Sequence, residues 1–149
     1  MNAMKKMISL ALAVLLLGGC LASDRFVSAD KLPKAAKEFL AKHYSGIEIV
    51  SVQADSFIDD HEVILKDGTN IEFNFRGAMR DVEAPRGATL PASVAALLPA
   101  PAQSYLEANY AGKPVRSISI DDGRWKVELA GMKAEVIFDR KGGYLGLDD

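Results

Sequence analysis

The sequence predicts an α+β fold: a tandem repeat of a helix plus an antiparallel sheet of three to four strands, with the helices packed on one sheet face. Two observations support this prediction. The stretch from Leu32 to Glu83 is matched, residue class by residue class, by the stretch from Leu98 to Asp148. Each stretch opens with Leu-Pro, continues to a Tyr-x-Gly turn and then contains three runs with strand character. Each copy is therefore expected to form the same unit.

Each copy is predicted to begin with an amphipathic helix. Pro33 and Pro99 suit the first turn of a helix, where the missing N–H costs nothing. Gly46 and Gly112 are expected to end the two helices, because glycine is favoured just beyond a helix C-terminus. The residues of the first copy that recur at spacings of three and four, and should face a sheet, are Leu32, Ala36, Phe39, Leu40 and His43.

Strand-like runs follow each helix in the same order. Alternation is clearest in the third run, where Ile71, Phe73 and Phe75 point one way and the polar residues between them point the other. Glycine-containing turns separate the runs, as hairpins require. The predicted strands, paired by copy, are 49–55 and 115–121, 61–65 and 125–129, 71–75 and 134–138, and a closing strand at 79–82 and 144–147.

The chain divides into five predicted segments. The connector between the copies is rich in proline and glycine, and residues 91–97 are expected to open a short helix that leads into the helix of the second copy. Because it is too short to act as a free linker, we expect the copies to dock closely, which would allow one continuous sheet. The segments are 1–19, a lipoprotein signal peptide; 20–31, a tether; 32–83, the first repeat; 84–97, the connector; and 98–149, the second repeat.

The N-terminal residues carry a targeting signal. Lys5 and Lys6 precede an apolar run at 7–17, and small residues follow it, which is the pattern of a secretory signal peptide. The run of about 11 residues is shorter than the roughly 20 that a membrane-spanning helix needs. Its end, Leu17 to Cys20, resembles the bacterial lipobox, so we expect cleavage before Cys20 and a lipid anchor on its thiol.

The anchor predicts where the mature protein resides. The residue after Cys20 is Leu21 rather than aspartate, which by resemblance to the enterobacterial sorting rule favours the outer membrane of the bacterial cell envelope, facing the periplasm. The alternative is an ordinary signal peptide that contains a cysteine by chance. Since Cys20 is the only cysteine, an intrachain disulfide is excluded.

The charge pattern argues against nucleic acid as a partner. The signal peptide contains two lysines and no acidic residue, so the mature chain has 18 − 2 = 16 basic and 20 acidic residues, a net charge of about −4. Both signs are interspersed and no basic run occurs, which is typical of a solvated surface rather than of a surface that binds a polyanion.

The order of the motifs resembles the PepSY-like family, also called beta-lactamase-inhibitor-like. The best match is Leu97-Leu98-Pro99 followed by Tyr105-Leu106 and Asn109-Tyr110, and 135–142 is close behind. The resemblance covers residues 32–149. It implies a secreted protein built from a helix-plus-sheet repeat in tandem. By kinship to a protein that inhibits an enzyme by docking a concave sheet, it also implies protein binding, which is an analogy of fold.

The solvent-facing side of the predicted sheet is the candidate binding surface. If Phe73 and Val127 pack under the helices, the residues that alternate with such positions face outward. Ile64 and Ile137 are apolar residues among charges on that side, and are either the centre of a binding patch or scattered surface apolars. The candidate partner-binding residues are Glu62, Ile64, Asn74, Arg76, Lys126, Glu128, Glu135 and Ile137, with Lys66 and Asp139 expected on the same side.

No catalytic constellation occurs in the sequence. The densest group of potential metal ligands is Asp59-Asp60-His61-Glu62. Because adjacent strand residues point to opposite faces and aspartate favours turns, we interpret this group as the end of a hairpin. Nucleophile-elbow, zinc and phosphate-loop motifs are absent. We therefore expect no catalytic residue, no metal site and no cofactor.

The sequence thus predicts a non-catalytic envelope lipoprotein that binds a protein or peptide partner, inhibitor-like or otherwise, through the exposed sheet face. The alternative is a periplasmic protein that senses an ion or a small ligand, with Asp59, Asp60, Asp121 and Asp122 as surface carboxylates. A low-activity enzyme is the third interpretation, and would require a deep polar pocket.

Overall fold

The computed structural model describes residues 24–55 and 58–149. The predicted signal peptide at 1–19, the predicted lipidation site Cys20 and the first residues of the predicted tether lie outside the described residues. Processing and lipidation of the chain therefore stay predictions.

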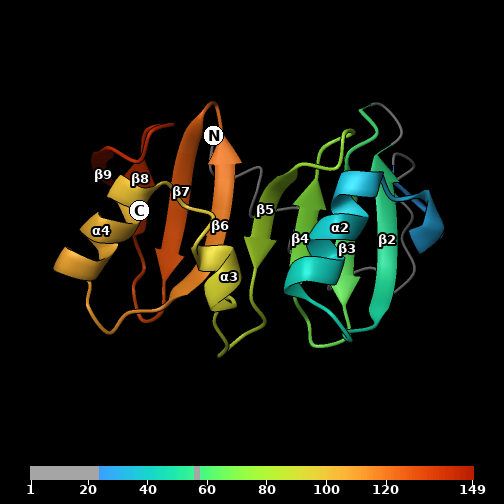
Figure 1. The fold of residues 1–149 in the computed structure, drawn as a ribbon, viewed down its shortest axis with the longest axis horizontal. Helices are drawn as coiled ribbons and strands as arrows, with labels where there is room; N and C mark the ends of the chain where they lie inside the picture. The colour runs from blue at the N-terminus through green and yellow to red at the C-terminus, as the bar shows by residue number, and fades with distance from the viewer. Residues whose placement is uncertain (1–23, 56–57) are drawn as a thin grey trace.

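The strands form one antiparallel sheet in chain order (Figure 1). The predicted strands 49–55, 61–65 and 115–121 have these bounds in the structure, and the bounds of the others shift by one or two residues. The strands are β1 (Asp24–Phe26), β2 (Ile49–Asp55), β3 (His61–Leu65), β4 (Asn70–Phe73), β5 (Met79–Glu83), β6 (Val115–Asp121), β7 (Arg124–Leu129), β8 (Glu135–Phe138) and β9 (Tyr144–Asp148).

The predicted fold class is wrong. The protein is not a tandem repeat of a helix plus its own sheet of three to four strands, but a single nine-stranded sheet with only short helices. The pairing of β5 with β6, in which Val82 lies opposite Ile118, overturns the prediction. Its physical reason is that β5 and β6 would each present unpaired N–H and C=O groups at an edge if they did not join. In addition, part of the predicted tether forms β1, which pairs with β2.

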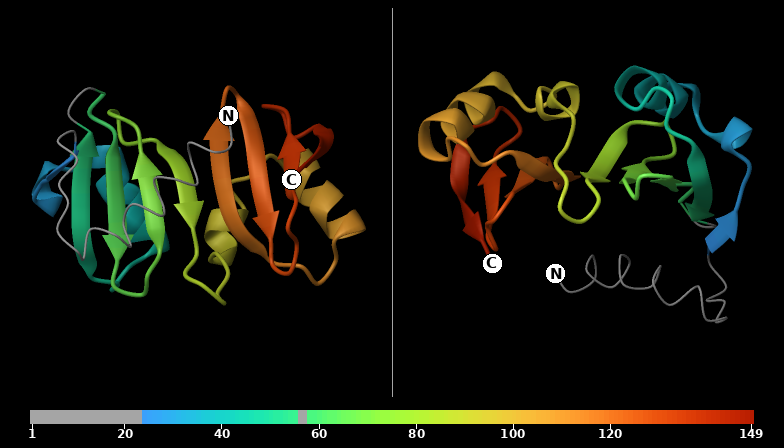
Figure 2. Two further views of the ribbon diagram at one scale, coloured as in Figure 1. Left: turned by 180° about the vertical axis from the view of Figure 1, so that it is seen from behind. Right: turned by 90° about the horizontal axis from the view of Figure 1, so that it is seen from below.

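The described helices lie on one side of the sheet (Figure 2). Pro99 precedes α4 at its N-cap position, and Pro33 precedes α2 in the same way. The sheet bends along its middle strands, so that the face without helices lies on the inside of the curve (Figure 2). The helices are α2 (Lys34–His43), α3 (Ala92–Ala95) and α4 (Ala100–Asn109), with a 3₁₀ turn, η2, at Ala29–Lys31.

A single row of aliphatic side chains crosses the sheet on the helix side. Cross-strand partners in an antiparallel sheet share a face, so the strand registers assign these residues to one line. Except for Leu147 at the edge, every member is buried. The row consists of Val52, Val63, Ile71, Val82, Ile118, Val127, Val136 and Leu147.

Aromatic side chains attach the two longer helices to the sheet in the same way. Phe39 of α2 meets Phe73 of β4 edge to face, with ring centroids 5.5 Å apart. Tyr105 of α4 meets Phe138 of β8 at 5.7 Å in a nearly equal orientation. Edge-to-face pairs at these separations are favourable beyond the area that they bury. Each longer helix is therefore held to the sheet by an edge-to-face contact at a matching position, and Tyr105 also stacks on Tyr144 of β9 with ring centroids 4.3 Å apart.

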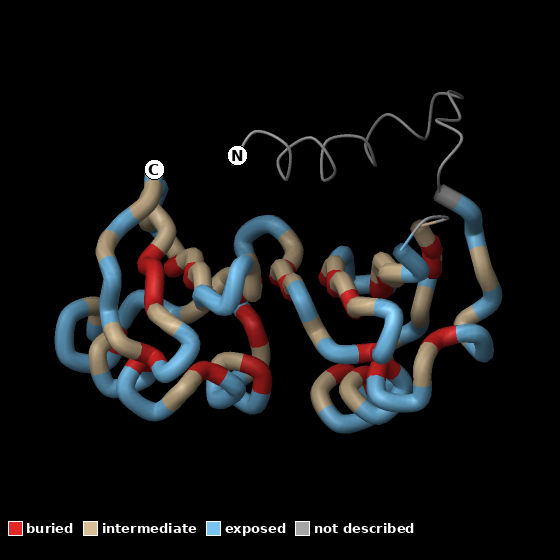
Figure 3. The backbone as a smooth tube through the Cα atoms, turned by 90° about the horizontal axis from the view of Figure 1, so that it is seen from above, coloured by how far each residue is buried: buried red, intermediate tan, exposed pale blue. Residues whose placement is uncertain are grey.

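Buried positions occur in both halves of the sheet, while the loops at the strand ends are mostly exposed (Figure 3). Val94 of α3 is fully buried in this same core, so the connector packs against the sheet rather than standing apart. No helix among residues 24–55 and 58–149 combines the length and the apolar character that a membrane span requires.

Glycine is required where two hairpin turns touch the helices. Gly77, in the turn between β4 and β5, and Gly142, in the turn between β8 and β9, both have positive φ, at 84° and 90°. A Cβ atom on Gly142 would lie 2.8 Å from Pro99 Cβ and 2.9 Å from the backbone nitrogen of Ala102. The first turn of α4 therefore approaches the hairpin too closely for any side chain.

Replacing Gly142 with alanine tests this close approach. We expect Gly142→Ala to lower the free energy of unfolding by about 1–2 kcal/mol for the left-handed backbone and by about 1–3 kcal/mol more for the steric overlap with α4. The matched control is Gly112→Ala, because Gly112 has φ of 78° and open space around its Cβ direction. The control should lose only the part of the free energy of unfolding that comes from the left-handed backbone conformation. Urea unfolding of both variants measures the difference, and equal losses would contradict the steric explanation.

Tyr44 is a buried tyrosine whose hydroxyl has no hydrogen-bond partner among the described residues. Burial, with a smaller contribution from the nearby Asp67 charge, raises the pKa of Tyr44 from 10.0 to about 12. The folded protein therefore keeps this phenol neutral at a pH where the unfolded chain would release its proton.

We expect Tyr44→Phe to keep or raise stability at pH 7, since a buried polar group without a partner costs about 1–3 kcal/mol. The wild-type protein should lose stability relative to the variant as pH rises from 10 towards 12, because only the unfolded state ionises Tyr44 in that interval. Urea unfolding at pH 8, 10 and 11.5 measures this. A constant difference between the two proteins across the three pH values would show that Tyr44 titrates normally.

Candidate functional site

The sheet face that lies away from the helices, hereafter the open face, is the candidate functional site. The strand registers assign two adjacent rows of mostly polar side chains to it. No helix among the described residues covers this face (Figure 2). The first row is Gln53, Glu62, Glu72, Asp81, Ser119, Lys126, Ile137 and Gly146, and the second is Ser51, Ile64, Asn70, Glu83, Ser117 and Glu128.

Six of the eight predicted partner-binding residues lie on the open face. They come from β3, β7 and β8, so they span most of the width of the sheet. Ile137 is nonetheless buried, and the predicted exposed isoleucine is thus part of the floor of the face. The six residues are Glu62, Ile64, Lys126, Glu128, Glu135 and Ile137.

Asn74 and Arg76 do not join the open face. β4 ends at Phe73, and Asn74 lies in the following turn. Its Oδ1 accepts hydrogen bonds from the backbone N–H groups of Arg76 at 2.9 Å and Ala78 at 3.0 Å. Arg76 is exposed and its guanidinium stacks 5.1 Å from the ring centre of Phe75. Asn74 therefore shapes the hairpin turn that packs on α2, and its role is local.

Asp139, also expected to face outward, has the same local role in the corresponding β8–β9 hairpin. Its Oδ1 accepts hydrogen bonds from the backbone N–H groups of Lys141 at 2.8 Å and Gly143 at 2.9 Å. The bond from Gly143, followed by that from Lys141, lowers the pKa of Asp139, so the carboxylate form is the one that the turn selects.

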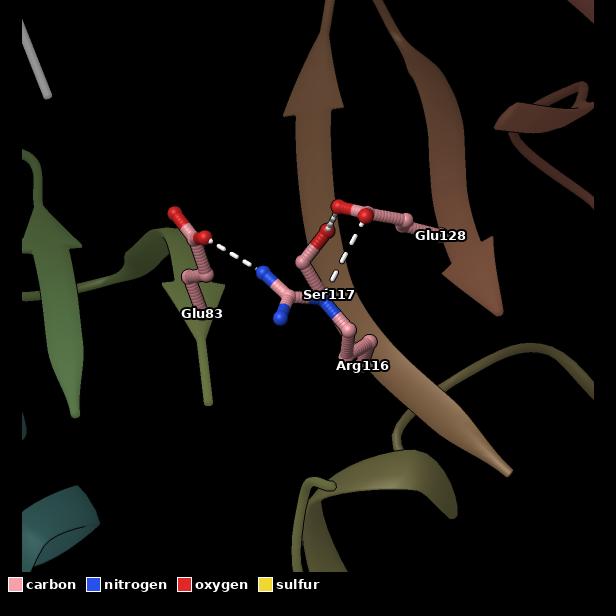
Figure 4. A network of polar contacts seen from close by, with 4 residues as sticks. All are labelled: Glu83, Arg116, Ser117 and Glu128. Carbon is pink, nitrogen blue, oxygen red and sulfur yellow. Dashed lines mark hydrogen bonds and ion pairs between the residues drawn. The ribbon is translucent and has the colours of Figure 1, made fainter. Parts of the chain in front are cut away.

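An ion-pair network occupies the centre of the open face, where β5, β6 and β7 lie side by side (Figure 4). The guanidinium of Arg116 donates to Glu83 Oε1 at 2.8 Å. Its Nε lies 3.3 Å from Glu128 Oε1, an ion pair without the alignment of a hydrogen bond. Ser117 donates to the other oxygen of Glu128 at 3.3 Å. The network thus joins the two halves of the sheet through one arginine.

Sequence reasoning missed Arg116 because of a local irregularity. The pairing of β6 with β7 shifts between Val115 and Ser117, which is a β-bulge. A bulge redirects one side chain, so strict alternation does not tell which face that residue uses. The signal in the sequence was an arginine among small and aliphatic residues, since β6 carries no other charge before Asp121.

Carboxylates lie next to one another in the first half of the open face. Glu62 is opposite Glu72, and Glu72 is opposite Asp81. The amide of Asn70 donates to Glu62 Oε1 at 2.7 Å. Like charges directly opposite on neighbouring strands are unfavourable. This half of the face is therefore acidic, in contrast to the mixed charges around Arg116.

The second half of the open face contains a shallow pocket of about 460 Å³. Lys126 lies on one side of it, 3.9 Å from both Asp121 and Asp148. Ile137 forms the apolar floor, and Leu145 of the edge strand β9 forms part of the rim. The pocket combines an apolar base with charged walls, which suits a side chain of a partner protein.

The side chains of Asp59, Asp60 and Glu62 contact different parts of the protein. Asp59 pairs with Arg25 at 3.7 Å, and Asp60 accepts a hydrogen bond from the backbone N–H of Phe75 at 3.0 Å. Glu62 lies on the open face with Asn70. Within the described part of the chain, no three histidine, cysteine or acidic side chains are arranged to hold a metal ion.

His43 and Trp125 are polar-capable residues that contact other parts of the chain rather than the open face. His43 Nδ1 and Ser93 Oγ lie 2.9 Å apart, so the histidine links α2 to α3, and burial lowers its pKa. Trp125 packs against the core and its Nε1 donates to the carbonyl of Arg140 at 3.4 Å. Neither residue faces the open face.

Comparisons with known proteins agree on one fold. The family model described as "putative beta-lactamase-inhibitor-like, PepSY-like" matches residues 59–145. A crystal structure described as a putative periplasmic protein of unknown function from Bacteroides vulgatus is 29% identical, with a TM-score of 0.75, over 85% of this chain and 99% of that chain. One described as a putative calcium-regulated periplasmic protein from Bacteroides thetaiotaomicron is 26% identical, with a TM-score of 0.74, over 85% and 97%.

A third crystal structure, of another periplasmic protein from Bacteroides vulgatus, has a TM-score of 0.76 at 22% identity over 87% of this chain and 100% of that chain, and shows the fold alone. No curated protein sequence matches the chain.

The Arg116 network should contribute to stability. We expect Arg116→Gln to lower the free energy of unfolding by about 1–2 kcal/mol at low salt, because it removes a charge-assisted hydrogen bond and leaves two carboxylates without their cation. The loss should shrink in 1 M salt, where the screening length is about 3 Å. Arg25→Gln is the control, since its exposed pair with Asp59 should be worth less than about 0.5 kcal/mol. Equal effects of the two substitutions would contradict a role for the network.

Proposed function

The chain belongs to the PepSY-like family, and from this premise we propose that it is a non-catalytic protein of the bacterial cell envelope that binds another protein or a peptide through its open face. The observation that carries the proposal is the open face itself. It runs from β2 to β9, contains charges of both signs and has no described helix over it. Arranged charges of this kind give specificity and faster association with a complementary partner.

The proposal includes a location. The similar structures from the two Bacteroides species are described as periplasmic proteins, which supports the same compartment for this chain. A lipid anchor at Cys20 would hold the protein at the outer membrane, facing the periplasm, with the sheet free to meet a partner in that space.

The geometry favours protein binding over ion sensing. One similar protein is described as calcium-regulated, which supports the alternative by analogy. Here, however, the Asp59 side chain pairs with Arg25 of β1 and the Asp60 side chain accepts the backbone N–H of Phe75 after β4. Asp122 is exposed in the turn before β7. The pocket on the open face has an apolar floor, which suits a side chain better than an ion.

Photo-crosslinking in the native envelope tests the proposal. A benzophenone amino acid would replace Glu62 or Glu128 on the open face and, in control proteins, Glu38 of α2 or Gln103 of α4 on the helix side. We expect one adduct of the same mass from both open-face positions and none from the helix positions.

Charge reversal identifies the surface more closely. Lys126→Glu combined with Glu135→Lys should reduce the adduct at least tenfold, while Lys37→Glu with Glu38→Lys on α2 should leave it unchanged. Adducts of equal yield from both sides of the sheet, or from the helix side alone, would refute binding through the open face.

A further inference from the structure

β9 presents an edge of the sheet. It pairs with β8 on one side and, among the described residues, with no strand on the other. Three of its side chains are large and apolar: Tyr144 is 42% exposed, and Leu145 and Leu147 are each 53% exposed. Natural edge strands are commonly protected by lysine, proline or a covering segment, because an open edge pairs with other chains. Within Tyr144–Asp148, β9 contains neither lysine nor proline, and its protective features are a bulge and the charge of Asp148.

Strand β5 closely matches β9 in its pairing with the preceding strand, but its other edge is already paired with β6. In the β4–β5 hairpin, Phe73 pairs with Met79, a bulge follows, and Ile71 pairs with Val82. In the β8–β9 hairpin, Phe138 pairs with Tyr144, a bulge follows, and Val136 pairs with Leu147. Leu147 in β9 therefore holds the position that Val82 holds in β5.

At the position of Val82, the outer edge of β5 bonds to the backbone of a neighbouring antiparallel strand, β6. The backbone N–H of Ala84, the residue just after β5, donates to the carbonyl of Arg116 in β6 at 3.0 Å. Hydrogen-bonded pairs recur every two residues in an antiparallel ladder, so Val82 and Ile118 form the next bonded pair. By the same register, the N–H and C=O groups of Leu147 point away from β8 toward the open edge.

The open face provides a pocket beside this edge. Gly146 is opposite Ile137 and has no Cβ, and a Cβ built there would meet nothing within 4 Å. The pocket of about 460 Å³ lies at this point, with Ile137 as its floor and Arg124 and Lys126 at its rim. An aromatic side chain opposite a glycine in a sheet covers the exposed backbone. Cations near the ring face add to such a contact.

We propose that β9 binds an extended segment of a partner protein as a tenth, antiparallel strand. The segment places a β-branched aliphatic residue opposite Leu147, as Ile118 lies opposite Val82, and an aromatic residue opposite Gly146, whose ring fills the pocket. Backbone hydrogen bonds supply the affinity and these two side chains supply the selection. The inference rests on the proposed function in that the partner is a protein, but it uses the sheet edge rather than the whole open face.

Charge favours a foreign strand over a second copy. Antiparallel pairing of β9 with itself, centred on Leu147, would make the two Asp148 carboxylates diagonal neighbours on one face, which is unfavourable. A foreign strand can instead carry a basic residue there, as β6 carries Arg116 beside Glu83.

A peptide derived from β6 is the probe. The labelled peptide has the sequence of residues 115–121 with Ser119→Tyr, so that tyrosine meets Gly146 and isoleucine meets Leu147. It is titrated against the full chain in detergent by fluorescence anisotropy. We expect binding with a dissociation constant below about 1 mM. The peptide with the native serine should bind about fivefold more weakly, in line with the range of cross-strand pair energies.

Backbone pairing is tested on both partners. Leu147→Pro removes the donor at the open edge, and N-methylation of the isoleucine that corresponds to Ile118 removes the matching donor of the peptide. Each change should weaken binding at least tenfold, and the methylated peptide gives this result without altering the protein. Phe26→Ala, on the opposite edge strand β1, should leave the affinity unchanged.

Four results would overturn the proposal. They are absence of binding at about 1 mM peptide, equal binding of the methylated and unmethylated peptides, loss of binding in Phe26→Ala, and sedimentation showing a dimer of the full chain that Leu147→Pro dissociates. The last result would assign the edge to a second copy. If charge reversal at Lys126 and Glu135 left the crosslinking unchanged, binding through the open face would be refuted while the peptide result could still stand. Failure of the open-face proposal is therefore distinguishable from failure of the β9 proposal.

Discussion

The pairing of β5 with β6 is the constraint on which the rest of the structure depends. Because Val82 lies opposite Ile118, the aliphatic row of one half continues into the other without a change of face. A slip of one residue at this junction would turn the side chains of β6–β9 over, and their charges would meet the helices. The polar rows depend on the same register, since Arg116 can reach both Glu83 and Glu128 only when β5 and β7 flank β6 in this alignment. The continuous core and the open face thus both follow from a single strand pairing.

The sequence could predict the elements but not this junction. Alternation located β2, β3 and β6 at their observed bounds, because each strand buries one face and period-two patterning reports burial directly. The fold class was wrong because alternation carries no information about which strand is the neighbour. Val82 and Ile118 would alternate with polar residues whether the two copies formed separate sheets or shared one. Their alternation therefore cannot distinguish the two arrangements. β1 was missed for a related reason: Asp24–Phe26 is three residues long, and its partner β2 lies across a helix in the chain.

The candidate site was predictable where strands are regular and not where they end or bulge. Glu62, Lys126 and Glu128 alternate with buried valines and lie on the open face as predicted. The prediction for Asn74 was wrong because its side-chain oxygen accepts hydrogen bonds from two backbone N–H groups in the turn after β4. A strand pattern does not reveal such local hydrogen bonds. Arg116 was overlooked because a bulge sets its direction. Ile137 has the predicted face but not the predicted exposure, since strands on both sides and the rim of the pocket surround it.

The open face and the edge of β9 would contribute differently to binding. Many charges on the face already have partners within the chain, such as Lys126 with Asp121 and Asp148. A partner protein that pairs with them exchanges one ion pair for another, so the gain lies in selectivity and association rate more than in affinity. Among the described residues no strand pairs with the outer edge of β9, so an incoming strand would bond to its backbone groups there. Burial of the apolar side chains of β9 would be favourable in itself. A segment that runs along β9 and turns onto the open face would use both, with the pocket at Gly146 as the point where the two surfaces meet.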